Sequence, residues 1–186
     1  MSRFSLGATA LQGVLTVSRQ RLGDARGSLS RLFCADELRA AGWHEPIAQI
    51  NHTVTALAGT VRGLHFQHPP HAENKLVSCL RGAVWDVAVD LRADSPTFLR
   101  WHAETLSAEN GMALLIPEGF AHGFQALTEN VEMLYCHSHA HVPAAEGGLH
   151  PLDAALAITW PLPVVGLSAR DAGQAPIAAG FAGLGP

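Results

Sequence analysis

The chain has 186 residues, a length that favours one domain with a single sizeable core, and we predict one domain over residues 1–186. Hydrophobic residues make up 48% and charged residues 15%, which excludes a disordered chain. The net charge is −4, and the 12 Lys and Arg residues form no basic run, so neither nucleic acid nor a membrane surface is predicted as a partner.

The cysteines and the N-terminal residues indicate the cellular compartment of the protein. Cys34, Cys79 and Cys136 are odd in number, widely spaced and form no CxxC pair, a pattern typical of a reducing compartment. The stretch 6–17 is mildly apolar, but polar residues interrupt it, so it predicts a strand better than a signal peptide. No segment approaches the ~20 apolar residues of a membrane span. We therefore predict a cytoplasmic protein.

Helix signals are scarce along the chain. Residues 36–41, with Gly42 behind them, predict one short helix with a glycine stop, and residues 153–156 predict a single turn. Short apolar runs separated by Gly, Pro and Asn turns fill the rest, namely 76–80, 84–91, 113–116 and 131–135. This spacing predicts an all-β jelly-roll barrel or sandwich with few short helices. The Ala-, Gly- and Pro-rich tail 176–186 is expected to be loosely ordered.

Within the run 84–91, alternate residues face opposite sides of a strand. Trp85, Val87 and Val89 share one face, whereas Asp86 lies on the other. Two interpretations stay open for Asp86: it points into a polar barrel interior, or it is solvated or pairs with a neighbouring strand.

Eleven histidines are many for this length. His137, His139 and His141 alternate, so on one strand they would share a face and resemble a metal cluster. A solvated edge face is the simpler interpretation, because no carboxylate is suitably spaced to complete a metal site.

The segment 61–77 carries the strongest chemical signal. Arg62, His65 and Lys75 are close in sequence, and buried cations without partners are costly, so an anionic ligand explains them best. Strict alternation would place Arg62 and His65 on opposite faces. We therefore predict that Gly63 breaks the alternation with a bulge or a strand start.

A second signal follows at residues 116–124, where a Pro-x-Gly turn at Pro117 precedes His122. This run resembles the second half of the cupin signature. In the first half, Lys75 stands where a metal ligand is expected, and an ammonium there argues against a divalent metal. The expected fold is therefore a cupin-type barrel with no metal and no other cofactor. A histidine base, the phenol of Tyr135 and side-chain cations are the parts required to move protons next to a carbonyl.

The ordered matches from about Gly23 to Asp171 resemble the sugar-nucleotide 3,5-epimerases typified by dTDP-4-dehydrorhamnose 3,5-epimerase. The matching segments are 23–27, 49–52, 62–67, 75–77, 86–92, 95–98, 106–110, 116–124, 134–135, 146–147, 160–161 and 167–171.

This resemblance implies a metal-free jelly-roll homodimer that acts on a nucleotide-linked 4-keto-6-deoxyhexose. By matching position, His65 is the base, oriented by Asp171, while Tyr135 is the acid on the opposite face of the sugar. Lys75 stabilises the enolate. The remaining matched positions line the substrate site: Arg26, Gln49, Asn51, Arg62, His122 and Glu146.

The implied chemistry suits these residue types. A ketone at C4 acidifies the hydrogens at C3 and C5, and one enolate serves both carbons. Epimerisation removes a proton from one face of the sugar and returns it to the other, so the base and the acid belong on opposite walls. A cation beside the developing oxyanion is worth on the order of 10²–10³ in rate.

The chain departs from the family pattern at two places. Residues 28–31 replace aromatic and acidic residues that help to hold the nucleotide, and Ala140 and His141 replace two tyrosines. The nucleotide, and inversion at one carbon or at both, are left open. The alternatives are a mono-epimerase or ketoisomerase, a sugar-nucleotide-binding protein without turnover, and a metal-dependent cupin that uses His122 with the His137 cluster.

Overall fold

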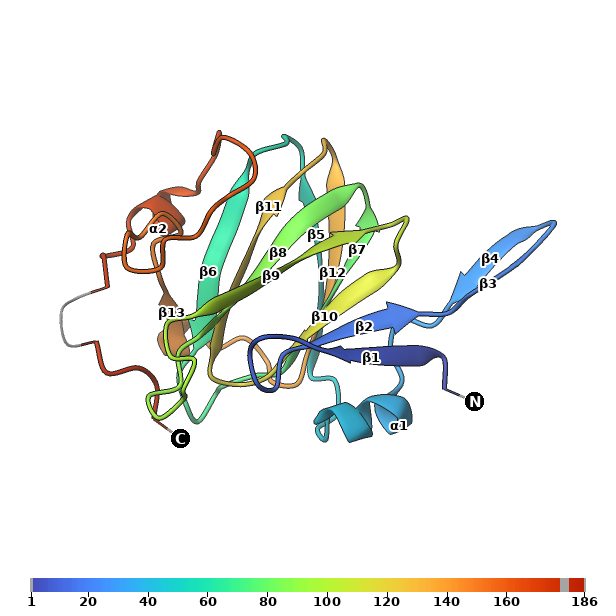
Figure 1. Cartoon of the computed structure of the whole chain (residues 1–186), viewed down its shortest axis with the longest axis horizontal. Helices are drawn as coiled ribbons and strands as arrows, with labels where there is room; N and C mark the ends of the chain where they lie inside the picture. The colour runs from blue at the N-terminus through green and yellow to red at the C-terminus, as the bar shows by residue number, and fades with distance from the viewer. Residues whose placement is uncertain (1, 178–180, 186) are drawn as a thin grey trace.

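The computed structural model describes residues 2–177 and 181–185, which form mainly β-strands (Figure 1). The strands are β1 (Phe4–Ala8), β2 (Leu15–Arg19), β3 (Arg21–Asp24), β4 (Gly27–Ser30), β5 (Gln49–Thr55), β6 (Val61–Gln67), β7 (Lys75–Arg81), β8 (Ala83–Asp90), β9 (Trp101–Ser107), β10 (Met112–Ile116), β11 (Phe120–Ala126), β12 (Val131–His137) and β13 (Glu146–Gly148). The helical segments are α1 (Ala35–Leu38), η1 (Arg39–Ala41), η2 (Pro143–Ala145) and α2 (Ala169–Ala172).

Two antiparallel sheets face each other and make the barrel (Figure 1). The six-stranded sheet has the order β1-β2-β10-β7-β12-β5, and the five-stranded sheet has the order β13-β6-β11-β8-β9. Strands β3 and β4 pair only with each other, and their hairpin projects away from the barrel (Figure 1). The prediction of an all-β fold with few short helices is confirmed.

The apolar core lies between the two sheets and on the outer faces that other segments cover. Phe124 and Met133 are fully buried in the space between the sheets, and burying each contributes roughly 1.5–3 kcal/mol. A second cluster, around Leu64, joins the five-stranded sheet to the C-terminal segment. A third packs Leu38 and Trp43, from the α1 region, against the six-stranded sheet. This packing closes one part of the barrel with apolar side chains.

Local predictions had mixed outcomes. The predicted helix at 36–41 is present as α1 followed by η1, and Gly42 ends it with φ of 94°. The turn at 153–156 is confirmed by a hydrogen bond from the Leu156 N–H to the Asp153 carbonyl, 3.1 Å long. The single strand predicted over 6–17 was wrong. The chain reverses there, because the Thr9 hydroxyl donates to backbone carbonyls of the turn and separates β1 from β2.

The tail and the cysteines complete the description. Of the predicted loose tail, residues 178–180 and 186 lie outside the described residues, whereas Leu184 is buried and bridges to Arg92. The three cysteines are free thiols. No helix in the described part of the chain is long and apolar enough to cross a membrane.

Candidate active site

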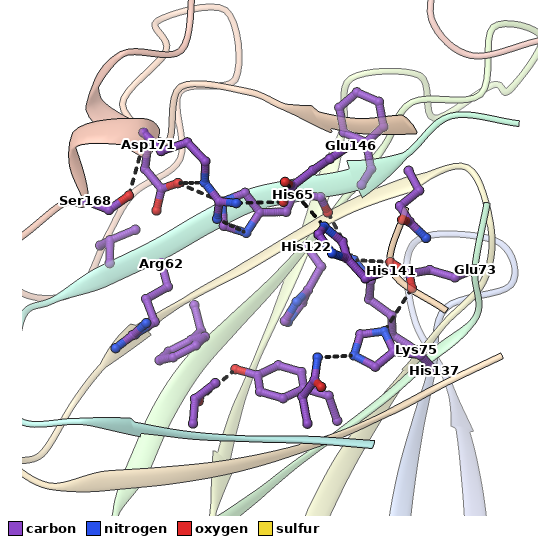
Figure 2. Close-up of a pocket in the computed structure, with 18 of the residues that line it drawn as sticks. Arg62, His65, Glu73, Lys75, His122, His137, His141, Glu146, Ser168 and Asp171 are labelled. Carbon is purple, nitrogen blue, oxygen red and sulfur yellow. Dashed lines mark hydrogen bonds and ion pairs between the residues drawn. The ribbon is translucent and has the colours of Figure 1, made fainter. Parts of the chain in front are cut away.

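A cavity of about 620 Å³ opens between the two sheets, beside the apolar core. Its walls come from β5, β7 and β12 of one sheet, from β6 and β11 of the other, and from the segment that carries α2 (Figure 2). Nine of the ten predicted site residues line it: Gln49, Asn51, Arg62, His65, Lys75, His122, Tyr135, Glu146 and Asp171. One cavity therefore gathers residues that lie as much as 122 positions apart in the chain, from position 49 to position 171.

Arg26 is the exception, and the structure corrects this prediction for a single copy of the chain. It lies in the turn between β3 and β4, exposed, and its guanidinium pairs with Asp24 at 2.6 Å. The hairpin leaves the barrel because it pairs with no other strand of the described chain. Arg26 therefore does not line the cavity of its own copy.

A bulge in β6 brings Arg62 and His65 to the same cavity. His122 of β11 pairs with His65, and Phe124 pairs with Arg62, so three steps along β6 match two steps along β11. Gly63 has φ of 125°, and a Cβ there would lie 2.6 Å from the Cα of Gly123. Only glycine tolerates both this positive φ and this close approach of the β11 backbone. The predicted break at Gly63 is confirmed.

His65 forms a dyad with Asp171. The two side chains meet at 2.7 Å between Nε2 and Oδ1 (Figure 2). Burial alone would raise the pKa of Asp171, but its hydrogen bonds with His65, with the Gly63 N–H and with Ser168 hold the pKa below its usual range. The Asp171 carboxylate is therefore ionised and accepts the Nε2 proton of His65, which leaves Nδ1 without a proton.

Arg170 is a residue that the sequence reasoning missed as a site residue. Its Nη2 lies 2.9 Å from His65 Nε2, and its Nη1 donates to Glu146 at 2.7 Å. Burial lowers the pKa of His65 most; the hydrogen bond and charge of Asp171 oppose this, while the nearby charges of Arg170 and Lys75 add to it. The net direction is downward, so the imidazole is neutral near pH 7 and can accept a proton. The sequence signals for Arg170 were its adjacency to Asp171 and its place in the matching segment 167–171.

Lys75 links the two walls of the cavity. Its Nζ donates to the His65 carbonyl at 3.2 Å and pairs with Glu73 at the same distance. Glu73 also accepts a hydrogen bond from His137 Nδ1 at 2.9 Å (Figure 2). Glu73 and His137 were not predicted as site residues. Period-two alternation could have found both, because Glu73 precedes Lys75 by two positions and His137 follows Tyr135 by two.

Tyr135 lies on the wall opposite His65. Its side chain is inward-facing on β12 and 8% exposed, and its hydroxyl lies 3.5 Å from the Thr53 hydroxyl. Burial raises the pKa of the phenol well above its usual value, so it stays protonated at neutral pH. The ring has His122 edge-on at 6.0 Å and His137 nearly parallel at 6.2 Å.

Asp86 faces the interior and also pairs with His122 of the neighbouring strand β11, so of the two interpretations only solvation was wrong. It is fully buried, and its two carboxylate oxygens lie 3.0 and 2.9 Å from His122 Nε2. Burial raises the pKa of Asp86, and the neighbouring His122 opposes this shift. The pair fixes the orientation of the His122 ring at the cavity.

The histidines at 137, 139 and 141 do not form a shared metal-binding face. Strand β12 ends at His137, and the other two lie on the loop beyond it: His139 contacts His71 at 3.4 Å, and His141 pairs with Glu146 at 3.5 Å. Among residues 2–177 and 181–185, no three His, Cys, Asp or Glu side chains are grouped to hold a metal ion. The solvated-edge interpretation was also wrong for His137, because its bond to Glu73 holds it in the cavity.

A carboxylate-held imidazole and a phenol on facing sheets, with an ammonium between them, define an acid–base enzyme on a jelly-roll scaffold. The family model described as dTDP-4-dehydrorhamnose 3,5-epimerase matches residues 8–179. The chain belongs to this family, and its members are isomerases.

The relatives agree with this assignment. The dTDP-4-dehydrorhamnose 3,5-epimerase of Salmonella typhimurium is 42% identical over 166 residues, which cover 88% of this chain and 90% of that protein. The dTDP-4-dehydrorhamnose 3-epimerase of Streptomyces niveus is 39% identical over 162 residues, covering 87% of this chain and 78% of that protein.

A solved structure shares the fold. It is the dTDP-6-deoxy-D-glucose-3,5-epimerase RmlC of Legionella pneumophila in complex with dTDP-4-keto-L-rhamnose, with a TM-score of 0.88, 37% identity and coverage of 92% of this chain and 91% of that chain. The prediction of a cupin-type jelly roll is confirmed.

Proposed function

We propose that this enzyme epimerises C3, C5 or both carbons of a nucleotide-linked 4-keto-6-deoxyhexose through an enolate. One observation carries the proposal: His65 and Tyr135 line one cavity from facing sheets, with Lys75 reaching between them. The names of the relatives, which are 3,5-epimerases and a 3-epimerase of dTDP-linked 4-keto sugars, support this reaction class.

The reaction begins at His65. Nδ1 of the neutral imidazole removes the proton next to the C4 ketone, and Asp171 stabilises the imidazolium that forms. The electrons of the broken C–H bond move to the C4 oxygen, where the Lys75 ammonium stabilises the negative charge. Tyr135 then donates its proton to the carbon from the opposite face, which inverts it and restores the ketone.

The remaining predicted residues are proposed to hold the substrate. Arg62 donates to the Thr55 hydroxyl and to the Val54 carbonyl, which fixes its guanidinium at the edge of the cavity. Gln49 and Asn51 are joined by a 3.0 Å hydrogen bond and present amide groups on the β5 wall. Together with His122 and Glu146 they supply donors and acceptors for sugar hydroxyls and phosphate oxygens, and this supports an anionic, hydroxyl-rich ligand.

A homodimer would account for the exposed apolar surface and for Arg26. Ile50 and Val54 on the outer face of edge strand β5 are 57% and 53% exposed, and Leu29 on the β3–β4 hairpin is 70% exposed. Apolar patches of this kind mark protein contacts. We propose that a second copy covers them and that the projecting hairpin carries Arg26 toward the partner's cavity, where its charge could meet a phosphate.

The test uses dTDP-, GDP- and CDP-linked 4-keto-6-deoxyhexoses in D₂O, with deuterium and configuration at C3 and C5 read by NMR. An epimerase incorporates deuterium with inversion. A ketoisomerase yields a 3-keto product without inversion, and a binding protein without turnover incorporates no deuterium. Absence of exchange with every sugar would contradict the proposal, while the preferred nucleotide would identify the substrate that residues 28–31 and His141 select.

A further inference from the structure

The cavity holds a second carboxylate–imidazole pair that the reaction as described does not use. Glu73 accepts from His137 Nδ1 at 2.9 Å, just as Asp171 holds the ring of His65 at 2.7 Å. The side chains of Glu73 and His137 are only 9% and 11% exposed. The pairs lie on facing sheets, since His65 belongs to β6 and His137 to β12 (Figure 2).

His137 stands beside Tyr135 on the same wall. Both side chains point inward from β12, two residues and therefore about 7 Å apart along the strand. His137 also pairs in register with Lys75 of the neighbouring strand, and Glu73 bridges the two side chains. The wall opposite His65 thus carries two proton-bearing groups, Tyr135 and His137, together with the ammonium that we assign to the enolate oxygen.

We propose that His137 is a second general acid of this enzyme, delivering the proton at one of the two carbons beside the ketone while Tyr135 serves the other. This inference rests on the proposed function. C3 and C5 flank C4 on either side, so a C4 oxygen held at Lys75 places one carbon on each side of the ammonium. Tyr135 and His137, two neighbouring proton donors on one wall, match this placement of C3 and C5 on either side of Lys75.

The step balances without any further reactant. His65 removes the proton from the carbon, and the C–H electrons form the enolate, whose oxygen Lys75 holds. The protonated His137 then donates its Nε2 proton to the opposite face of that carbon. The enolate electrons form the new C–H bond, and the C4 carbonyl returns. His137 is left neutral, His65 is left protonated, and exchange with solvent resets both rings.

Glu73 has the properties that this role requires. Burial would raise its pKa, but the hydrogen bond from His137 and the charge of Lys75 outweigh that effect and hold the pKa below its usual range. The resulting carboxylate accepts the Nδ1–H of His137 and fixes the orientation of the ring, so any second ring proton lies on Nε2. Nε2 is left for the cavity, where Asn51 Nδ2 lies 3.4 Å away. When Nε2 carries a proton, this contact cannot be a hydrogen bond, because the Asn51 amide nitrogen is also a donor. The Nε2–H is then free to point at a substrate carbon in the cavity.

The experiment compares His137→Asn, Tyr135→Phe and Glu73→Gln, each with the preferred 4-keto sugar in D₂O. In His137→Asn the amide nitrogen takes the place of Nδ1, so the bond to Glu73 is retained while the Nε2 proton is lost. The matched control is His102→Asn, which changes another carboxylate-paired histidine, 3.1 Å from Glu104, that does not line the cavity. NMR reads deuterium and configuration at each carbon separately.

We expect the wild type to invert both carbons. His137→Asn should lose about 100-fold in inversion at one carbon and exchange deuterium there with retention through His65, while it inverts the other carbon normally. Tyr135→Phe should show the complementary loss, and Glu73→Gln a weaker form of the His137→Asn pattern. The unaffected carbon in each variant reports that the protein is folded, and His102→Asn should match the wild type.

Three outcomes would overturn the second acid: inversion of a single carbon by the wild type, normal inversion of both carbons by His137→Asn, or loss at the same carbon in His137→Asn and Tyr135→Phe. Each of these leaves the epimerase proposal intact, because exchange still occurs. Failure of the proposed function gives a different result, namely no deuterium at either carbon in the wild type.

Discussion

The two walls of the cavity are built in different ways. On the five-stranded sheet, the proposed base His65 depends on a contact between β6 and α2, because Asp171, which holds its ring, lies 106 positions away in the chain. On the six-stranded sheet, Lys75, Tyr135 and His137 project from the paired strands β7 and β12, so strand register alone sets their spacing. The base wall can therefore be disturbed by changing one distant residue, whereas the acid wall requires changes within the sheet itself.

The largest effect is expected for His65→Ala, which removes the proposed base and leaves the six-stranded wall with Tyr135 intact. Deuterium exchange at both sugar carbons should fall by about 10³- to 10⁴-fold, because the imidazole proposed to accept the proton is gone. The measurement is NMR of the sugar in D₂O. Exchange near the wild-type rate would show that the base lies elsewhere.

Tyr135→Phe tests the acid wall. The base and Lys75 remain, so the enolate still forms, and His65 can return deuterium only to the original face. Formation of the fully inverted sugar should drop about 100-fold while deuterium continues to enter with retention of configuration. A variant that inverts the sugar as fast as the wild type would exclude Tyr135 as an acid.

Asp171→Asn weakens the base wall without removing the base. The imidazole loses the carboxylate that orients it and stabilises its protonated form, so exchange should fall by about 10²-fold, less than in His65→Ala because the imidazole itself remains. Ser168→Ala serves as a milder comparison, since the Ser168 hydroxyl accepts from the Asp171 N–H at 3.0 Å. If Asp171→Asn were as inactive as His65→Ala, Asp171 would have more than an orienting role.

The pH profile reports the charge that Arg170 places on the base wall. As the proposed base, His65 must be neutral to act, so activity should rise with pH through the pKa of His65, which lies below its ordinary value. Arg170→Met removes a nearby positive charge and should move this acidic limb of kcat/KM to higher pH. Lys-for-Arg replacement, which retains the charge, is the control and should leave the limb in place.

The smallest effect is expected from a chelator. Lys75 is proposed to supply the positive charge for the enolate, so the enzyme should keep full activity in EDTA. Loss of turnover that a single divalent ion restores would contradict this assignment of Lys75.

The sequence by itself determined much of the scaffold and supplied the candidates for the reactive groups. Short alternating runs with turn residues between them are a local property of the chain, so they predicted an all-β barrel. Gly63 likewise predicted the bulge that brings Arg62 and His65 to the same cavity. Resemblance to a known family then named nine residues that do line that cavity.

Only the tertiary structure decided which of the other polar residues join the site. Alternation could not tell whether Asp86 faces solvent or the barrel interior, since that depends on the partner sheet, and the buried His122 decided it. The Glu73–His137 pair depends on the loop before β7 lying beside the end of β12, where His137 pairs in register with Lys75, and Arg170 enters only because α2 docks on β6. Arg26 matched the family in sequence, yet its hairpin pairs with no other strand of the described chain, so a single copy does not bring Arg26 to its own cavity.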